Sequence, residues 1–230
     1  MHVIVLASHK GGSGKTTLAG HLAVAAQEAG AGPVVLIDTD PQGSLTDWWN
    51  TRQTVTPLFA RANAGKLAAG IEKIRDLGVH TLIIDTPPAM GGAIEEIVGI
   101  ADLVLIPARP SPHDLRAVGT TVGLAARLGK ATAFVINGAT PRARITAEAA
   151  LSLSQHGTLA PVIIHHRTGF ASSMIDGRIA LEISGDPRSA DEIRRLWDYV
   201  GSRLAALPGR PEAPLLLPTS APGGGEQPYA

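Results

Sequence analysis

The sequence predicts an α/β protein with a doubly wound, mostly parallel sheet. Three observations support this fold class. Apolar segments short enough for buried strands alternate with longer segments of helical periodicity. A glycine-rich loop joins the first of these strands to the first helix, and acidic residues directly follow two later strands. A chain of 230 residues can bury one sizeable core, so we expect a single folded domain at 1–207 and a separate tail at 208–230.

Residue patterns place the individual elements. Continuous apolar runs predict strands at 3–7, 33–38, 81–85, 103–106, 133–136 and 159–164. Helical patterns predict helices at 18–26, 111–128, 147–155 and 190–207. From Pro208 the composition becomes rich in proline and glycine, which is typical of a flexible tail.

Composition excludes several classes of protein. The chain has no cysteine, which rules out structural disulfides and cysteine-ligated metals. It has no apolar stretch of about 18 residues, so no membrane-spanning helix is expected. The first strand begins at once, which leaves no room for a signal peptide, so a cytoplasmic location is expected.

The glycine loop reads Lys10-Gly-Gly-Ser-Gly-Lys-Thr-Thr17 and lies between a strand and a helix. Glycines let backbone N–H groups turn toward phosphate oxygens, and the helix N-terminus adds partial positive charge. Lys15 is expected to reach the β- and γ-phosphates, and the Thr16 hydroxyl to bind Mg²⁺. The sequence therefore predicts a nucleoside triphosphate site whose binding residues are Gly11, Gly12, Ser13, Gly14, Lys15, Thr16 and Thr17.

Two further loops carry acids at strand ends. Asp38-Thr-Asp40-Pro-Gln-Gly follows the second predicted strand, and Asp85-Thr-Pro-Pro follows the third. Ligands of open α/β sheets bind at the carboxyl ends of strands, where such carboxylates can hold Mg²⁺ or orient the attacking water.

The three loops together resemble the deviant Walker A box, switch I and Walker B elements of the ParA/MinD superfamily. The resemblance implies a P-loop NTPase of the SIMIBI type with ATP and Mg²⁺ as cofactors. It implies that Lys15 and Asp40 act in catalysis, Asp40 by positioning water, and that Thr16, Asp38 and Asp85 serve the metal. Lys10 would cross to the partner's nucleotide, which implies an ATP-dependent homodimer.

Later segments extend the resemblance to about residues 2–205. The stretches 106–114, 164–182 and 190–197 resemble those of small plasmid-type ParA proteins, a group that includes McdA-like cargo-positioning ATPases. The resemblance implies a slow, switch-like ATP hydrolase that binds non-specific DNA on the nucleoid. It would position a plasmid, chromosome or protein assembly, and a ParB-like or other cargo adaptor protein would stimulate hydrolysis.

Charge alone does not predict DNA binding. The formal net charge is +0, and residues 138–203 hold eight arginines, no lysine and seven acids. The resemblance places the DNA contacts among basic residues of the C-terminal half, which makes Arg167 and Arg195 the first candidates. Arg194, Arg178 and Arg144 follow. The alternative for each is an ordinary solvated or ion-paired arginine.

Asn137 follows the strand at 133–136 and is a candidate for contacting adenine, with a turn or capping role as the alternative. No N-K-x-D guanine motif is present, which disfavours a GTPase. A MinD-like membrane regulator is the main alternative, but the tail is interrupted by Pro208, Pro211, Pro214, Pro218 and Pro222, and Arg210 is its only basic residue. No membrane partner is therefore expected. A metabolic P-loop ligase is a further alternative without a substrate motif.

Overall fold

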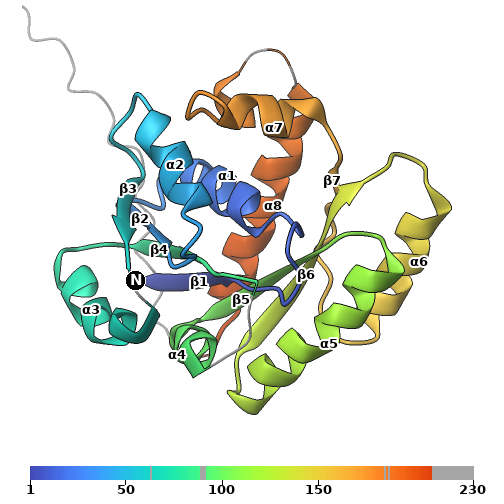
Figure 1. Ribbon diagram of the computed structural model, residues 1–230, viewed down its shortest axis with the longest axis horizontal. Helices are drawn as coiled ribbons and strands as arrows, with labels where there is room; N and C mark the ends of the chain where they lie inside the picture. The colour runs from blue at the N-terminus through green and yellow to red at the C-terminus, as the bar shows by residue number, and fades with distance from the viewer. Residues whose placement is uncertain (63, 89–91, 184, 186, 209–230) are drawn as a thin grey trace, which may run out of the picture.

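The computed structural model describes residues 1–208 except 63, 89–91, 184 and 186. In this part of the chain seven strands form one sheet in the order β3-β2-β4-β1-β5-β6-β7, and all neighbouring strands pair in parallel (Figure 1). The strands are β1 (His2–Leu6), β2 (Val34–Asp38), β3 (Leu58–Arg61), β4 (Thr81–Asp85), β5 (Leu103–Ala108), β6 (Ala131–Ala139) and β7 (Ile164–His165). The prediction of a doubly wound parallel sheet is confirmed.

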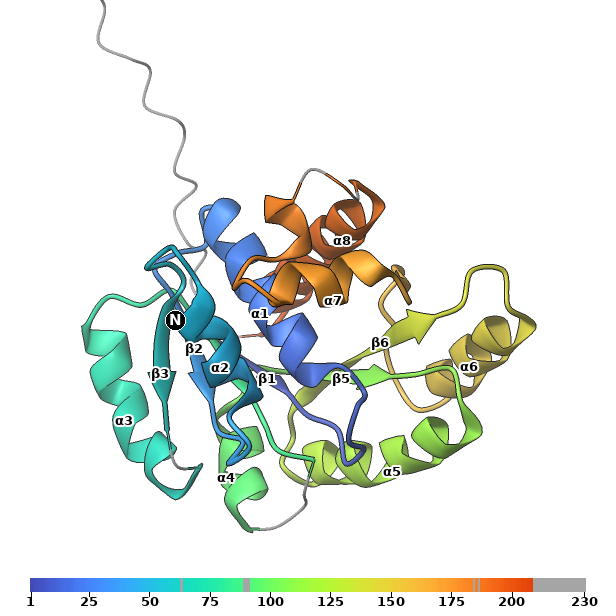
Figure 2. The same cartoon turned by 45° about the horizontal axis from the view of Figure 1, so that its top comes forward.

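Helices cover both faces of this sheet. They are α1 (Lys15–Glu28), α2 (Ser44–Thr51), α3 (Ala64–Asp76), α4 (Gly92–Ile100), α5 (Pro112–Arg127), α6 (Arg144–Ser154), α7 (Thr168–Met174) and α8 (Pro187–Ala205), with a 3-10 turn, η1, at Ala180–Glu182. Figures 1 and 2 show α1, α2, α7 and α8 on one face and α3, α4, α5 and α6 on the other. None of the described helices is long and apolar enough to cross a membrane.

The two layers of helices enclose two separate apolar clusters, one on each face of the sheet. Successive residues of β1 alternate between them: Ile4 and Leu6 pack toward α1 and α8, whereas Val3 and Val5 pack toward α3, α4 and α5. Burial on both faces explains why the central strands read as continuous apolar runs in the sequence.

Some boundaries differ from the expected ones. The strand predicted at 159–164 is confined to β7, and Leu159 forms only an isolated bridge with Phe134. Pro161 lies between Leu159 and β7. Proline has no N–H to donate to a strand ladder, which accounts for the interruption. Helix α6 begins at Arg144, before the predicted start at 147. The tail lies outside the described residues apart from Pro208, so its boundary at 207/208 stays a prediction.

The chain reverses its winding between β1 and β4, and this reversal positions the functional loops. These strands are neighbours, yet α1 follows β1 onto one face of the sheet and α4 follows β4 onto the other. The carboxyl ends of the two strands therefore border a crevice of the kind in which ligands of open α/β sheets bind. Leu6 and Asp38 are both in register with Asp85 at this edge.

Candidate functional site

The loop between β1 and α1 has the backbone of a phosphate-binding loop. Gly12 and Gly14 have positive φ angles of 74° and 94°, in the left-handed region that glycine tolerates. Gly14 is the N-cap residue of α1 and provides no side-chain cap. The first N–H groups of α1 therefore point toward the loop without a capping side chain, an arrangement that suits an anion.

Lys15 lies inside this loop, and its side chain is largely buried. Its Nζ donates hydrogen bonds to the carbonyl oxygens of Ser8 and Lys10, each at 3.3 Å. Burial lowers the pKa of Lys15, and the nearby carboxylates of Asp85 and Asp40 oppose that change. The loop thus holds an ammonium group close to where a bound phosphate chain would lie.

Thr16 and Asp85 meet where the start of α1 lies beside the carboxyl end of β4. The Thr16 hydroxyl donates a 2.7 Å hydrogen bond to Oδ2 of Asp85. Asp85 is 1% exposed, and within the described structure its Oδ1 is buried without a hydrogen-bond partner. Burial raises the pKa of Asp85 to about 7, and the charge of Asp38 adds to this effect. A divalent cation would supply the missing counter-charge, and a hydroxyl with a carboxylate is a donor set that suits Mg²⁺.

Asp38 shapes the loop that follows β2. Its Oδ1 accepts a hydrogen bond from the Asp40 N–H at 2.9 Å, and its Oδ2 accepts from the Thr46 N–H at 3.0 Å and hydroxyl at 2.7 Å. Asp40 is half-buried, and its Oδ1 accepts the Gln42 N–H at 2.9 Å. Asp38 therefore orders the segment that presents Asp40, and it lies next to Asp85 across the β2–β4 pair.

Two threonines that the sequence analysis did not single out join the strand ends. The Thr39 hydroxyl donates to the carbonyl oxygen of Asp85 at 2.6 Å, and the Thr86 hydroxyl donates to that of Leu6 at 2.7 Å. Each threonine directly follows one of the acids, so the repeated Asp-Thr pair was the signal available in the sequence. These bonds tie β1, β2 and β4 together at the edge that carries the acids.

Two further predicted residues lie at the rim of the same loop. The side chain of Lys10 is exposed, and its backbone N–H donates to the Ser8 hydroxyl at 3.3 Å. The Asn137 side chain, at the end of β6, donates from Nδ2 to the carbonyl oxygen of Ser13 at 2.7 Å. The structure thus gathers all the predicted nucleotide and metal residues around one loop.

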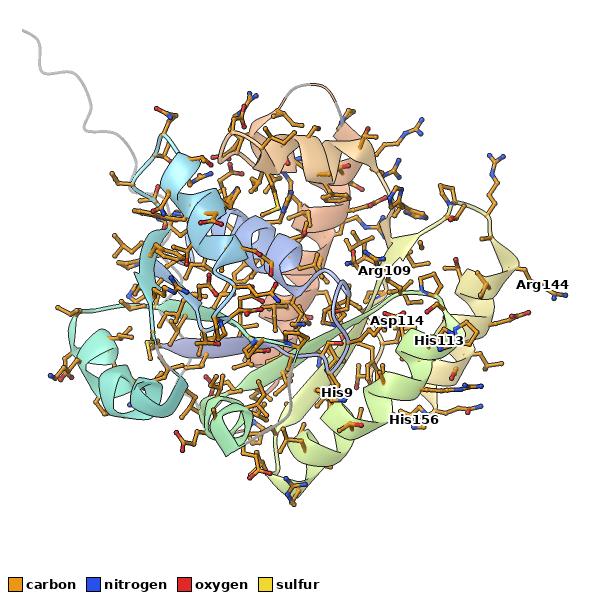
Figure 3. All side chains as sticks on the ribbon, viewed as in Figure 1. His9, Arg109, His113, Asp114, Arg144 and His156 are labelled. Carbon is orange, nitrogen blue, oxygen red and sulfur yellow. The ribbon has the colours of Figure 1, made fainter. Side chains whose placement is uncertain are left out.

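The candidate DNA-binding arginines are more dispersed. Arg167 and Arg195 both line a cavity of about 530 Å³ between β7 and α8, which we call the β7–α8 groove. Arg188 also lines it, although the sequence analysis did not select this residue. Arg178 lines a separate cavity of about 330 Å³ beside the end of α2. Arg144 lies at the outer end of α6, far from His9 of the loop after β1 (Figure 3).

Ion pairs distinguish these arginines further. Arg167 is held by Glu192, which accepts from its Nη2 at 2.7 Å and from Nδ1 of His165 at 2.8 Å. The Arg195 side chain is 59% exposed, and its carboxylate neighbour Asp191 lies 3.8 Å away. Arg194 is exposed on α8, whereas Arg178 and Arg144 pair with Asp176 and Glu148 respectively. In the β7–α8 groove, Arg195 is therefore freer than Arg167 to meet a ligand.

Comparison with protein families decides the class of this site. The family model described as the CobQ/CobB/MinD/ParA nucleotide binding domain matches residues 4–183, which include the P-loop and both acidic loops. The chain belongs to this family. The expected relationship to ParA and MinD is thereby confirmed, and the protein is a P-loop ATPase of that type.

Individual relatives agree with this assignment. The chain is 38% identical over 122 residues to "Maintenance of carboxysome distribution protein A" of Gloeobacter kilaueensis. The aligned part covers 52% of this chain and 55% of that protein. This match thus spans about half the length of the Gloeobacter relative. The protein of the same name from Halothiobacillus neapolitanus is 26% identical over 209 residues, covering 86% of this chain and 95% of that protein.

Solved structures show the same fold. The McdA–ATP complex from Cyanothece has a TM-score of 0.74 at 18% identity and covers 87% of this chain and 96% of its own. MinD with Mg-ADP from Pyrococcus horikoshii also has a TM-score of 0.74, at 17% identity, and covers 89% and 97%. At such identities the likeness concerns the fold alone.

Proposed function

We propose that the chain is a Mg²⁺-dependent, slow ATPase that forms ATP-sandwich dimers, binds DNA without sequence specificity and positions a cargo. The observation that supports this most directly is the meeting of Lys15, Thr16 and Asp85 in one crevice beside an exposed Lys10. The first three form a nucleotide and metal site within one subunit. Lys10, at the rim, is placed to act on a second subunit.

Within one subunit the residues have separate roles. The N–H groups of the loop and Lys15 bind the phosphate chain, and Thr16 with Asp85 holds Mg²⁺, which neutralises charge on the phosphates. Asp38 contributes its charge to the metal shell and keeps the following loop in place. Asp40, half-buried near the start of that loop, positions the attacking water. Because these groups mainly orient and neutralise, slow and switch-like turnover is expected.

Lys10 would couple nucleotide binding to dimerisation. Its exposed ammonium group extends from a loop whose other lysine is already buried against backbone carbonyls. Reaching the phosphates of a partner's ATP would give Lys10 a partner of opposite charge. ATP would then join two subunits across the nucleotide, and hydrolysis would separate them.

DNA binding is assigned to the arginines near α8. Arg195, Arg194 and Arg167 lie on or beside the β7–α8 groove, and a two-fold dimer would present two copies of this surface. Arg188 joins them on the same groove. Arg178 and Arg144 remain candidates at greater distance along the surface. Contacts of this type go to phosphates, so affinity should fall steeply with salt.

The relatives suggest the biological task. Two are named for carboxysome distribution, and others are named ParA and chromosome-partitioning ATPase Soj. We therefore propose a cargo-positioning ATPase in the cytoplasm, associated with the nucleoid. A ParB-like or other cargo adaptor protein would stimulate hydrolysis and release the dimer from DNA.

The test is binding of random-sequence duplex DNA with no nucleotide, with ADP and with ATP, at several salt concentrations. We expect DNA binding only in the presence of ATP, and we expect the affinity for DNA to fall steeply as the salt concentration rises. Arg195→Glu should weaken binding and reduce the salt slope by at least about 1. Arg75→Glu is the matched control, because Arg75 is an exposed arginine on α3, on the opposite face of the sheet.

Each outcome has a defined meaning. Equal affinity in all three nucleotide states would remove the proposed switch, and absence of binding would remove DNA from the function. Equal losses in Arg195→Glu and Arg75→Glu would show that net charge, and not the β7–α8 groove, determines the affinity.

A further inference from the structure

Asn137 reaches the P-loop from the far side of β5. Its Nδ2 donates a 2.7 Å hydrogen bond to the carbonyl oxygen of Ser13, a residue 124 positions away in the chain. Ser13 is fully buried, and Asn137 is half-buried at the carboxyl end of β6. The bond is thus a tertiary contact between the loop and a strand two positions away from β1 in the sheet.

The Asn137 side chain packs so closely on the loop that position 14 cannot carry a side chain. A Cβ placed on Gly14 would lie 2.0 Å from Nδ2 of Asn137 and 3.2 Å from its Cγ, far closer than nonbonded atoms approach. Gly14 also has a φ of 94°, which a side chain would strain. The glycine and the asparagine therefore fit each other, and the amide occupies the space directly over the Ser13–Gly14 peptide.

The orientation of this peptide has a direct consequence for phosphate binding. In a trans peptide the C=O and the following N–H point in opposite directions. Because the Ser13 carbonyl oxygen points to Asn137, the Gly14 N–H points away from it. Gly14 is the N-cap residue of α1, so this N–H belongs to the group that an anion at the helix N-terminus meets.

We propose that Asn137 is a positioning residue of the P-loop, whose amide fixes the Ser13–Gly14 peptide so that the Gly14 N–H faces the bound phosphates. This role rests on the proposed phosphate-binding function of the loop. It differs from a contact with adenine, because it acts on the phosphate chain whatever base is attached.

That difference defines the experiment. Wild-type protein and the Asn137→Ala variant are titrated calorimetrically with ATP, GTP and inorganic tripolyphosphate, each with Mg²⁺. Loss of one well-formed hydrogen bond should lower the affinity for ATP and the affinity for tripolyphosphate by a similar factor of about ten. The ratio of ATP to GTP affinity should stay unchanged. The ³¹P resonance of the β-phosphate in bound ADP should also shift.

Two further variants guard against a merely structural effect. Asn137→Asp preserves the side-chain shape but replaces the donor by an oxygen that faces the Ser13 carbonyl, so it should weaken all three ligands more than Asn137→Ala. Asn50→Ala removes an exposed asparagine of α2 and should bind like the wild type. Melting temperatures without ligand verify that each variant is folded.

The alternatives give distinct results. If Asn137→Ala lowers ATP affinity and the ATP-to-GTP ratio but leaves tripolyphosphate binding and the β-phosphate resonance unchanged, Asn137 contacts the base and the inference is wrong. Unchanged affinity for every ligand would also overturn it. If the wild type binds none of the three, the proposed function itself fails.

Discussion

Arg52 and Glu182 form a two-pronged ion pair in which Nη2 and Nη1 donate to the two carboxylate oxygens at 2.6 and 2.8 Å. The Arg52 side chain is 4% exposed, and its Nη1 also donates to the carbonyl oxygen of Gly177 at 2.8 Å. Arg52 directly follows α2, and Glu182 lies in η1, shortly before α8. The pair therefore links the helix after the Asp40 loop to the segment that leads to the arginines of α8.

Arg52→Ala should strongly destabilise the fold. The substitution leaves Glu182 without its cation and the Gly177 carbonyl without its donor, which costs about 3–5 kcal/mol for a buried pair. Urea denaturation would measure the change in the free energy of unfolding. Arg75→Ala removes one member of an exposed ion pair on α3. This variant should change the free energy of unfolding by less than about 0.5 kcal/mol. Equal effects of the two variants would contradict a structural role for the Arg52–Glu182 pair.

The buried ring of His21 predicts how the stability of the fold depends on pH. It is fully buried, its Nε2 accepts the Ala180 N–H at 3.1 Å, and its Nδ1 lies 2.8 Å from the Thr17 carbonyl oxygen. Accepting at Nε2 places the proton of the neutral ring on Nδ1, where it is donated to Thr17. Burial lowers the pKa of His21 from 6.5 to about 4. The folded protein thus keeps His21 neutral where the unfolded chain protonates it.

The contribution of His21 to stability is therefore fully present above about pH 6.5 and is lost as the pH falls toward 4. The shift corresponds to a loss on the order of 3 kcal/mol. His21→Gln should flatten this part of the pH dependence, measured by urea denaturation between pH 4 and 7. His156→Gln, at an exposed histidine, should keep the wild-type slope. Identical slopes for the wild type and His21→Gln would contradict the prediction.

Lys10→Ala tests the role of the exposed lysine across the dimer. Because Lys10 contributes its backbone, which the substitution keeps, and an exposed side chain to its own subunit, monomeric ATP binding should stay close to wild type. ATP-dependent dimerisation and turnover should be lost. Sedimentation velocity with and without ATP measures the dimer, with Lys73→Ala on α3 as the exposed control. Normal ATP-dependent dimers in Lys10→Ala would refute the proposed trans role.

Asp40→Ala should separate binding from hydrolysis. Removing the carboxylate that positions water should slow ATP hydrolysis by about two orders of magnitude. ATP binding should persist, so an ATP-bound dimer should accumulate. Phosphate release and size-exclusion chromatography in ATP measure the two effects, and Asp47→Ala, at an exposed acid of α2, is the control. Hydrolysis at the wild-type rate would remove Asp40 from the mechanism.

The central strands were predictable because each is buried on both faces and therefore appears as a continuous apolar run. The edge strands were harder to predict. β3 is mostly exposed, and β7 is only two residues long, so neither has a strong pattern. The P-loop and acidic loops were also predictable, because their residues are adjacent in the chain. The roles assigned to those residues stay predictions.

By itself, the sequence determined the class of protein, since a strand, a glycine loop and a helix form a phosphate site from consecutive residues. Only the tertiary structure decided which distant side chains complete it. Asn137 meets Ser13 because the strand order places β6 two positions from β1. Arg52 meets Glu182 because α2 and η1 pack on the same face of the sheet. Arg167 shares one groove with Arg188 and Arg195 because α8 packs against β7. Such contacts depend on how the layers pack, which local patterns do not encode.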